Sequence, residues 1–149
     1  MSVRAVDTVR GIETVLSVDK ADNETYVVLK CATQISYTSD KETLEAACYG
    51  GTEMLMSGAD AVKSFSLTGQ VKEYASVDQA NNVSYYDLLL WHEAGTLKKF
   101  KYARPHVGDT VQEFEGFVTA LGESGDPKGL QTYTATITPR KKGTISKLV

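Results

Sequence analysis

The sequence predicts a mainly β protein: a two-sheet β-sandwich or barrel with one flanking α-helix and a long extended loop. Thr, Val, Tyr, Ile, Phe and Trp, which favour strands, make up 48 of the 149 residues. Short stretches alternate apolar with polar residues, the period of a half-buried strand. No repeat, low-complexity segment or linker interrupts them, so we expect residues 1–149 to form a single domain.

Five segments are predicted as strands: residues 25–31, 62–74, 97–103, 111–121 and 132–138. In residues 62–74, Phe65 and Leu67 fall on one face while polar side chains fall on the other. In residues 132–138, three inward residues alternate with four threonines, which disfavours a helix. Residues 25–31 have apolar residues on both faces, whereas the other four strands are expected to pack one face and expose the other.

Residues 84–95 are predicted to form the helix. Ser84 followed by Asp87 resembles a capping box, and Gly95 suits the left-handed position after the last turn. Apolar residues recur between them at helical spacing. We expect this helix to lie on the sheets and cover an open end or flank.

Residues 36–60 are predicted as a long loop, because about 25 residues exceed the usual length of a connection. The loop is either an extended hairpin or a segment that contacts something, and residues 43–47 suit a helical turn. The cluster of Met54, Leu55 and Met56 either packs within the chain or meets a partner subunit, a role that flexible Met-rich surfaces suit.

The net charge of −3 is unevenly distributed. Residues 1–127 carry 11 basic and 19 acidic side chains, net −8, whereas residues 128–149 carry five basic and no acidic ones. Residues 139–149 form a basic C-terminal tail with Arg140, Lys141 and Lys142 in a row. Such a run either contacts nucleic acid, ends a solvated strand or docks on an acidic neighbour, and the acidic remainder of the chain disfavours nucleic acid.

Motifs of catalysis and metal binding are missing from the sequence. Cys31, Cys48, His92 and His106 do not have the spacing of a zinc site, and both cysteines are expected to be buried or half-buried. Residues 122–125 are interpreted as a turn rather than a catalytic loop. Glu113 and Glu115 share one strand face, where solvation is a commoner role than acid-base chemistry. We therefore expect no enzyme, no cofactor and no metal.

The first ten residues lack the apolar core of a signal peptide, and the densest apolar stretch, residues 88–91, is far shorter than a membrane span. We expect synthesis in a reducing cytoplasm and no membrane-spanning segment.

The order of elements resembles the tail tube proteins of long-tailed bacteriophages and the related tube proteins of contractile injection systems. The local likeness is strongest in residues 114–139, where a strand, a Gly/Pro loop and a Thr-rich strand follow one another. The resemblance implies a structural virion protein of the phage tail, whose subunits form rings, typically six-fold, that stack into a tube for DNA ejection. It implies self-association and contacts with the tape measure and other tail proteins, while DNA transits without specific binding.

Two sets of residues are candidates for these roles. Contacts between rings or subunits are expected from Tyr49, Met54, Leu55, Met56, Arg140, Lys141 and Lys142. A polar face lining the lumen is expected from Ser64, Ser66, Thr68, Gln70, Glu113 and Glu115. The acidic body suits a lumen that does not hold DNA.

An alternative is an OB-like module that binds single-stranded nucleic acid. It would use the aromatic and basic residues Tyr85, Tyr86, Phe100, Tyr102, Lys98, Lys99 and Lys101 for stacking and phosphate contacts. The charge of residues 1–127 disfavours it.

Overall fold

The computed structural model describes residues 3–4, 8–29, 32–48 and 50–149, with the side chains of Ile12 and Cys48 outside the description. In chain order the elements are η1 (Gly11–Glu13), β1 (Val15–Asp19), β2 (Tyr26–Val28), β3 (Ala32–Asp40), β4 (Thr43–Cys48), β5 (Gly51–Met56), β6 (Val62–Gln70), η2 (Gln79–Asn81), α1 (Tyr85–Ala94), β7 (Lys98–Ala103), β8 (Thr110–Ser124), β9 (Thr132–Pro139) and β10 (Thr144–Lys147). The predicted mainly β architecture with one α-helix is confirmed.

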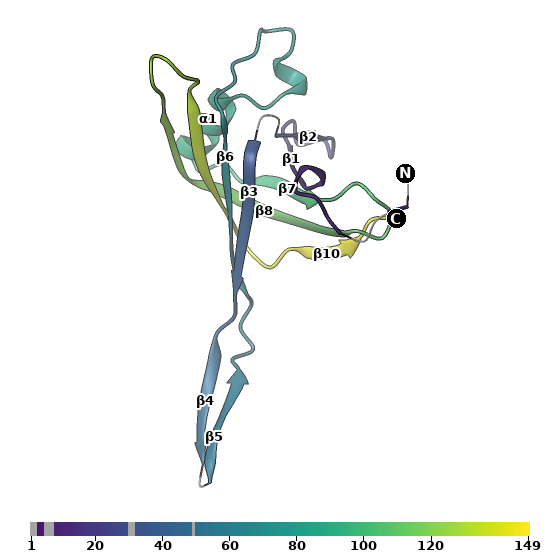
Figure 1. Cartoon of the computed structure of the whole chain (residues 1–149), viewed down its shortest axis with the longest axis vertical. Coiled ribbons are helices and arrows are strands. Elements are labelled where there is room, and N and C mark those ends of the chain that lie inside the picture. The colour runs from purple at the N-terminus through teal and green to yellow at the C-terminus, as the bar shows by residue number, and fades with distance from the viewer. Residues whose placement is uncertain (1–2, 5–7, 30–31, 49) are drawn as a thin grey trace.

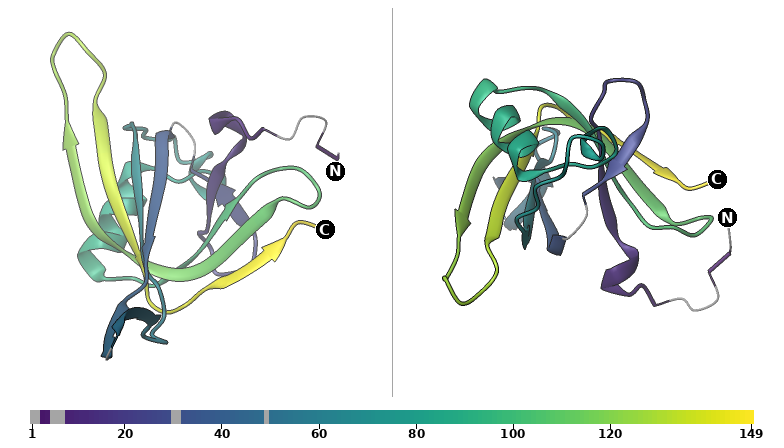
Figure 2. Two further views of the ribbon diagram at one scale, coloured as in Figure 1. Left: turned by 60° about the horizontal axis from the view of Figure 1, so that its bottom comes forward. Right: turned by 90° about the horizontal axis from the view of Figure 1, so that it is seen from above.

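Eight strands form one large antiparallel sheet in the order β2-β1-β7-β8-β9-β6-β3, with β10 pairing β8 beside the end of β9. The sheet is strongly curved, and β4 and β5 form a separate two-stranded hairpin that projects from the body (Figures 1 and 2). The long strand β8 joins the two halves, because its first residues pair with β7 and β10 while its last residues pair with β9.

The core lies on the concave side of this sheet. Phe65 is fully buried and stacks on Phe114, with ring centroids 4.4 Å apart, and Phe114 in turn stacks on Phe100 at 5.5 Å. From β9, Tyr133, Ala135 and Ile137 are buried, as the alternation of residues 132–138 predicted. The expected packing of one strand face therefore holds for both β6 and β9.

The helix α1 begins and ends at the predicted residues. The Ser84 hydroxyl accepts from the Asp87 N–H, and the Asp87 carboxylate accepts from the Ser84 N–H, which completes the capping box. Gly95 follows in the left-handed conformation at φ 65°. The helix packs on β8 through Leu88 and Trp91, so it covers the flank of the sheet.

Several local expectations were wrong. Residues 43–47 form strand β4 rather than a helical turn, because they pair along their length with β5. Residues 122–124 continue strand β8 instead of turning, and the turn comes at Asp126–Gly129. The predicted loop of residues 36–60 includes the end of β3, a strand that its mostly polar, exposed side chains concealed.

The remaining expectations were partly met. Within residues 25–31 the observed strand is Tyr26–Val28. The basic tail is not a free end, since Thr144–Lys147 pairs with β8. Cys31 and the Cys48 side chain lie outside the described residues, so their expected burial stays a prediction.

Candidate assembly surfaces

The β4–β5 hairpin exposes apolar side chains on both of its faces. Leu44 lies opposite Leu55 on one face, whereas Met54 and Met56 lie on the other. These four side chains are 50–62% exposed. Packing of the Met-Leu-Met cluster within the chain is therefore wrong, and the cluster is available to a partner. Tyr49, predicted to act with this cluster, lies outside the described residues.

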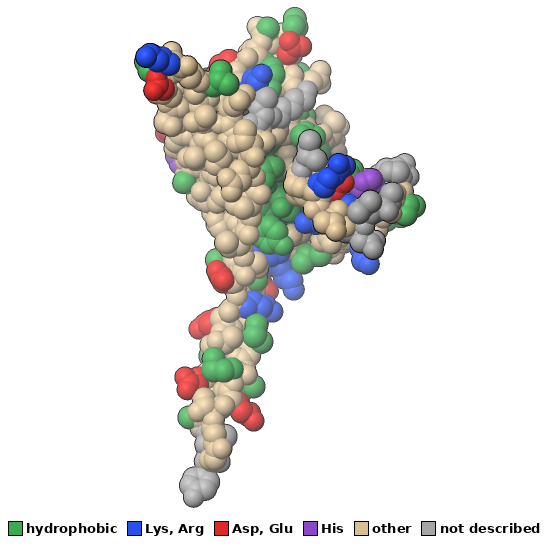
Figure 3. All heavy atoms as spheres, in the orientation of Figure 1, with side chains coloured by type: hydrophobic (Ala, Val, Ile, Leu, Met, Phe, Trp, Pro, Cys, Tyr) green, Lys and Arg blue, Asp and Glu red, His purple; other side chains and the backbone are tan. Residues whose placement is uncertain are grey.

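An uncharged polar surface covers the outer side of three neighbouring strands. The register places Ser66 between Ser36 of β3 and Thr136 of β9, so the three share one face. The surface, which we call the hydroxyl face, consists of Gln34, Ser36, Thr38, Ser64, Ser66, Thr68, Gln70, Thr132, Thr134, Thr136 and Thr138. In Figure 3 the upper body over β3 and β6 is almost entirely free of charged and hydrophobic side chains. The structure thus brings the predicted residues Ser64, Ser66, Thr68 and Gln70 together on this face.

Glu113 and Glu115 do not join the hydroxyl face. They lie on the half of β8 that pairs with β7. Glu113 is 4.0 Å from the Lys101 ammonium, and Glu115 is 3.5 Å from the Arg140 guanidinium. Their carboxylates are thus balanced by neighbouring cations, an arrangement of surface ion pairs.

The basic residues Arg140, Lys141 and Lys142 form the turn between β9 and β10. They line a cleft of about 720 Å³ together with Lys99, Tyr26 and Phe114. The Arg140 N–H donates to the Glu115 carbonyl at 2.7 Å, which holds the turn against β8. Lys141 and Lys142 remain exposed beside it.

A second cleft, of about 860 Å³, lies between the two edges of the curved sheet. We call it the seam cleft, and its lining is Val9, Gly11, Thr14, Val15, Val28, Leu29, Ala32, Thr33, Gln34, Ile35, Tyr102 and Arg104. Tyr102 is 7% exposed, and burial raises the pKa of its phenol, while the nearby Arg104 acts in the opposite direction. Figure 3 shows hydrophobic side chains in the hollow beside β3.

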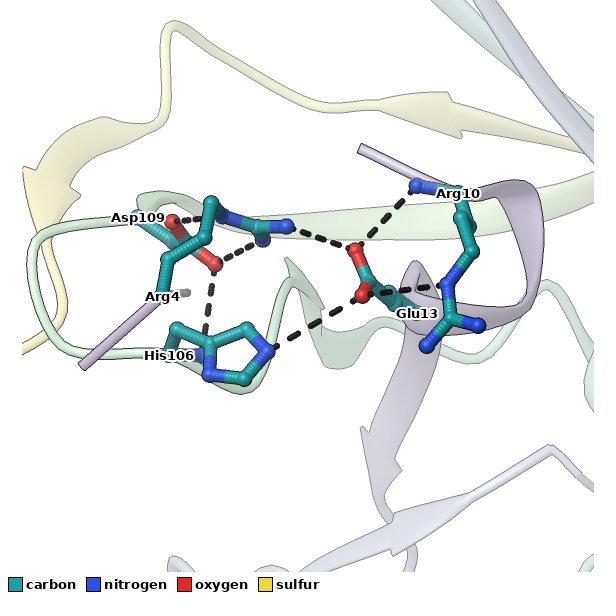
Figure 4. A network of polar contacts seen from close by, with 5 residues as sticks. All are labelled: Arg4, Arg10, Glu13, His106 and Asp109. Carbon is teal, nitrogen blue, oxygen red and sulfur yellow. Dashed lines mark hydrogen bonds and ion pairs between the residues drawn. The ribbon is translucent and has the colours of Figure 1, made fainter. Parts of the chain in front are cut away.

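A network of charges ties the N-terminal segment to the loop between β7 and β8 (Figure 4). The Arg4 guanidinium binds Asp109 through two hydrogen bonds and Glu13 through one of 2.7 Å. These bonds to Asp109 and Glu13 raise the pKa of Arg4, and Arg4 lowers the pKa of both carboxyls. Because Leu148 also exchanges backbone hydrogen bonds with Gly108 and Asp109, both ends of the chain meet at this loop.

Burial of three of its seven residues argues against the OB-like alternative, whereas Tyr86 and Lys99 are exposed. Phe100 is fully buried and Tyr102 nearly so, which leaves neither ring free to stack on a base. Lys98 is also buried, where its ammonium donates to the Lys20 carbonyl at 3.0 Å and lies over the Trp91 ring at 5.4 Å. The alternation of aromatic and basic residues in β7 therefore builds core, not a nucleic-acid surface.

The two histidines make contacts that connect elements of the fold. His92 lies in the last turn of α1, with Nδ1 2.9 Å from the Val118 carbonyl, so it attaches the helix to β8. His106 lies 3.9 Å from the Glu13 carboxylate in the terminal network. The part of the chain that the structure describes contains no cluster of three or more metal-ligating side chains. Nor does any helix in that part have the length and apolar character needed to cross a bilayer.

No protein-family model matches this sequence, and neither does any curated protein. The fold, however, matches solved structures over nearly its whole length. A chain in the tail of an empty gene transfer agent particle, refined with C6 symmetry, has a TM-score of 0.68 at 16% identity, and the match covers 95% of this chain and 100% of that one.

Two further structures match in the same way. The tail tube of SPP1 has a TM-score of 0.71 at 9% identity, covering 95% of this chain and 81% of that one. A chain of the PVC sheath-tube complex, an extracellular contractile injection system, has a TM-score of 0.68 at 11% identity, covering 97% and 95%. The fold expected from the sequence is confirmed: this chain has the fold of the tail tube proteins of phages and contractile injection systems.

Proposed function

We propose that this protein is a structural subunit of a phage-type tail tube, assembling into stacked hexameric rings that form the conduit for DNA ejection. The observation that carries the proposal is the likeness, across at least 95% of the chain, to chains of the SPP1 tail tube and the gene transfer agent tail. The role is structural and not enzymatic, and its site is the virion tail after synthesis in the bacterial host cytoplasm.

The edges of the sheet support ring closure. The outer edge of β3 and the last residues of β8 each lack a second strand partner among the described residues. Four strands, β3, β6, β9 and the end of β8, alternate in direction between these edges. Because four is even, rotation about an axis along the strands brings β8 antiparallel to β3 of the next copy. Pairing of this kind removes exposed edges, which a monomer would leave open to aggregation.

The hydroxyl face is the proposed lining of the lumen. Its hydroxyl and amide side chains carry no positive charge. They cannot replace the counterions of a DNA phosphate backbone, so the face does not provide the main source of nonspecific DNA affinity. The opposite side of the same strands carries the core, with Phe65 and Ile137 fully buried, and cannot face a channel. DNA, and before it a tape measure protein, would pass along this face without being held.

Two exposed segments are the proposed contacts between subunits or rings: the hairpin residues Met54, Leu55 and Met56, and the basic turn Arg140–Lys142. Contacts with other tail proteins are proposed as well. Their exposure supports this role, since large apolar side chains on a projecting hairpin mark interaction surfaces. Surfaces of this kind on one subunit must meet complementary surfaces on another if assembly is to propagate.

Negative-stain microscopy and size-exclusion chromatography over a concentration series test the proposal directly. We expect rings or tubes as concentration rises. A strictly monomeric protein that binds oligonucleotides at physiological salt would contradict it.

Two neighbouring substitutions test edge pairing. Successive residues of an edge strand direct their N–H groups alternately toward the partner strand and outward. We compare Thr38→Pro with Ser39→Pro, each of which removes one backbone N–H of β3. The variant that loses an N–H directed toward β6 should be less stable, whereas the variant that loses an outward N–H should fold normally but fail to close the ring. Circular dichroism separates the two effects. Two folded variants that both form normal rings would show that β3 is not the ring contact.

The lining is tested by adding charge to the hydroxyl face. Ser66→Lys and Thr136→Lys lie opposite each other on neighbouring strands and would place a ring of cations in the lumen. We expect tubes that retain short DNA at low salt, with Thr110→Lys, an exposed position on the other half of β8, as control. If Thr110→Lys tubes retain as much DNA as tubes with lysine at position 66 or 136, a lumen lined by the hydroxyl face is contradicted.

A further inference from the structure

Arg104 is a cation for which the described residues provide no partner. The other three arginines each form an ion pair: Arg4 with Asp109, Arg10 with Glu13 and Arg140 with Glu115. The Nε of Arg104, by contrast, is buried, and no described residue accepts a hydrogen bond from it. A charged group with an unsatisfied buried donor is costly, which favours an acceptor that reaches the guanidinium from the cleft that Arg104 lines.

The surroundings of Arg104 define what that acceptor must be attached to. Arg104 lines the seam cleft, whose other walls include the apolar side chains Val28, Leu29 and Ile35. A partly apolar hollow of about 860 Å³ that is lined by a guanidinium without a described partner suits a segment that carries both apolar side chains and a carboxylate.

The β4–β5 hairpin has this composition. Residues 40–60 carry five acidic side chains and one basic one, net −4. On one face Glu53 lies beside Leu44 and Leu55, and on the other Glu45 lies opposite Met54. A lone two-stranded hairpin is marginally stable in water. Because this hairpin exposes apolar residues on both faces, we expect another protein surface to bury them.

We propose that the seam cleft is the socket for the β4–β5 hairpin of a second copy, with Arg104 pairing to a carboxylate of that hairpin. The inference rests on the proposed tube assembly and names the surface that joins successive rings.

The placement of the two surfaces supports contact between copies rather than within one. The hairpin projects beyond the Asp40 end of β3, whereas the cleft borders residues 32–35 at the opposite end of the same strand (Figure 1). A chain cannot reach its own cleft in this way, but a copy displaced along the strand direction can. A head-to-tail contact of this type repeats without closing and generates a filament of rings.

Site-specific photo-crosslinking locates the socket. A benzophenone amino acid replaces exposed Thr52 on β5, and assembled protein is irradiated, digested and analysed by mass spectrometry. We expect crosslinks to peptides of a second copy that contain residues 32–35 or Arg104. The matched control places the probe at Val77, which is 85% exposed on the body and should give no such crosslinks. Crosslinks to Arg140–Lys142 or to α1 would overturn the proposal.

Charge reversal tests the pairing itself. Arg104→Glu is expected to raise the concentration needed for assembly about tenfold or more, the scale for breaking a buried charge pair. Glu45→Lys with Glu53→Lys is expected to do the same, and combining all three changes should recover most of the loss. Lys72→Glu, on an exposed loop, is the control and should assemble as wild type. Circular dichroism confirms that each variant folds.

The outcomes separate the two proposals. A wild-type protein that never assembles contradicts both the tube and the socket. If the wild type forms tubes and Arg104→Glu assembles equally well, the socket is contradicted and the tube is not. The socket is also contradicted if Lys141→Glu impairs assembly and Glu45→Lys with Glu53→Lys restores it, because the hairpin would then bind the basic turn.

Discussion

The carboxylate of Asp87 lies 2.8 Å from the ammonium of Lys20 and joins the first turn of α1 to the turn that follows β1. Lys20 also donates to the Asn82 carbonyl at 2.8 Å and to the Gln79 carbonyl. One lysine thus fastens η2, the start of α1 and the turn between β1 and β2 to one another. The capping box that the sequence predicted is, in the folded chain, part of a tertiary junction.

Removing Asp87 should destabilise the fold by more than the loss of a helix cap. Asp87→Ala removes the carboxylate that pairs with the partly buried Lys20 ammonium and accepts from the Ser84 N–H, and we expect a loss of about 2 kcal/mol in urea unfolding. Asp87→Asn keeps an acceptor and should lose about half as much. Glu93→Ala, at an exposed position of the same helix, serves as control. A change under about 0.5 kcal/mol for Asp87→Ala would show that the junction is not stabilising.

The stacked rings of Phe65 and Phe114 should dominate core stability. Phe65 is fully buried and also stacks on Tyr37 at 5.3 Å, so Phe65→Ala leaves a cavity and is expected to lower the free energy of unfolding by about 3–5 kcal/mol. Its neighbour Ser66 points to the hydroxyl face, and Ser66→Ala should change stability by less than about 0.5 kcal/mol. Similar losses for both variants in chemical denaturation would contradict the assignment of the two faces.

Two glycines of β8 should respond differently to the same substitution. A Cβ at Gly116 would lie 2.7 Å from the Thr138 carbonyl oxygen, whereas one at Gly122 would meet nothing closer than the Thr134 hydroxyl at 3.7 Å. We expect Gly116→Ala to cost about 1–3 kcal/mol through overpacking of β8 against β9, and Gly122→Ala to be tolerated. Thermal unfolding of the pair measures this. Equal melting temperatures would mean that β9 moves away at no cost.

Acid should release the N-terminal segment before the rest of the fold. Arg4 holds the pKa values of Asp109 and Glu13 below their ordinary range, and the Glu13 carboxylate also accepts from the Arg10 N–H and faces His106. The stabilisation is complete above the unfolded pKa of about 4 and is lost as pH falls through the lower folded values. NMR of the Arg4 Nε–H resonance across this range should show its release.

A variant provides the control for this acid response. Arg4→Ala should show an N-terminal segment that is already released at neutral pH and insensitive to acid. The prediction fails if the Arg4 resonance keeps its folded position at pH values at which both carboxyls are protonated.

Sequence periodicity was sufficient wherever a segment packs one face against the core. Phe65 and Leu67 in β6, the inward residues of β9 and the capped helix Ser84–Gly95 follow local rules, because burial of alternate residues and satisfaction of helix-end N–H groups are determined by near neighbours in sequence. These elements, with their order, were enough to predict the mainly β fold and its likeness to tail tubes.

Sequence periodicity did not predict elements whose pairing partners lie far away in the chain. Strand β3 is polar and mostly exposed, and it forms because β6 pairs with it across a hairpin, so no burial pattern marks it. Strand β4 contains residues with helical propensity that pairing with β5 overrides. Likewise β7 alternates aromatic and basic residues like a nucleic-acid surface, yet its aromatic rings are core.

The sequence by itself determined which residues alternate, where the helix is capped and that the acidic and basic charges are segregated along the chain. Only the tertiary structure decided that hydroxyl side chains of three strands form one face, that Glu113 and Glu115 lie apart from it, and that the described residues give the Arg104 Nε no acceptor. Such facts depend on strand register and on the curvature of the sheet, which bring together residues that are distant in sequence.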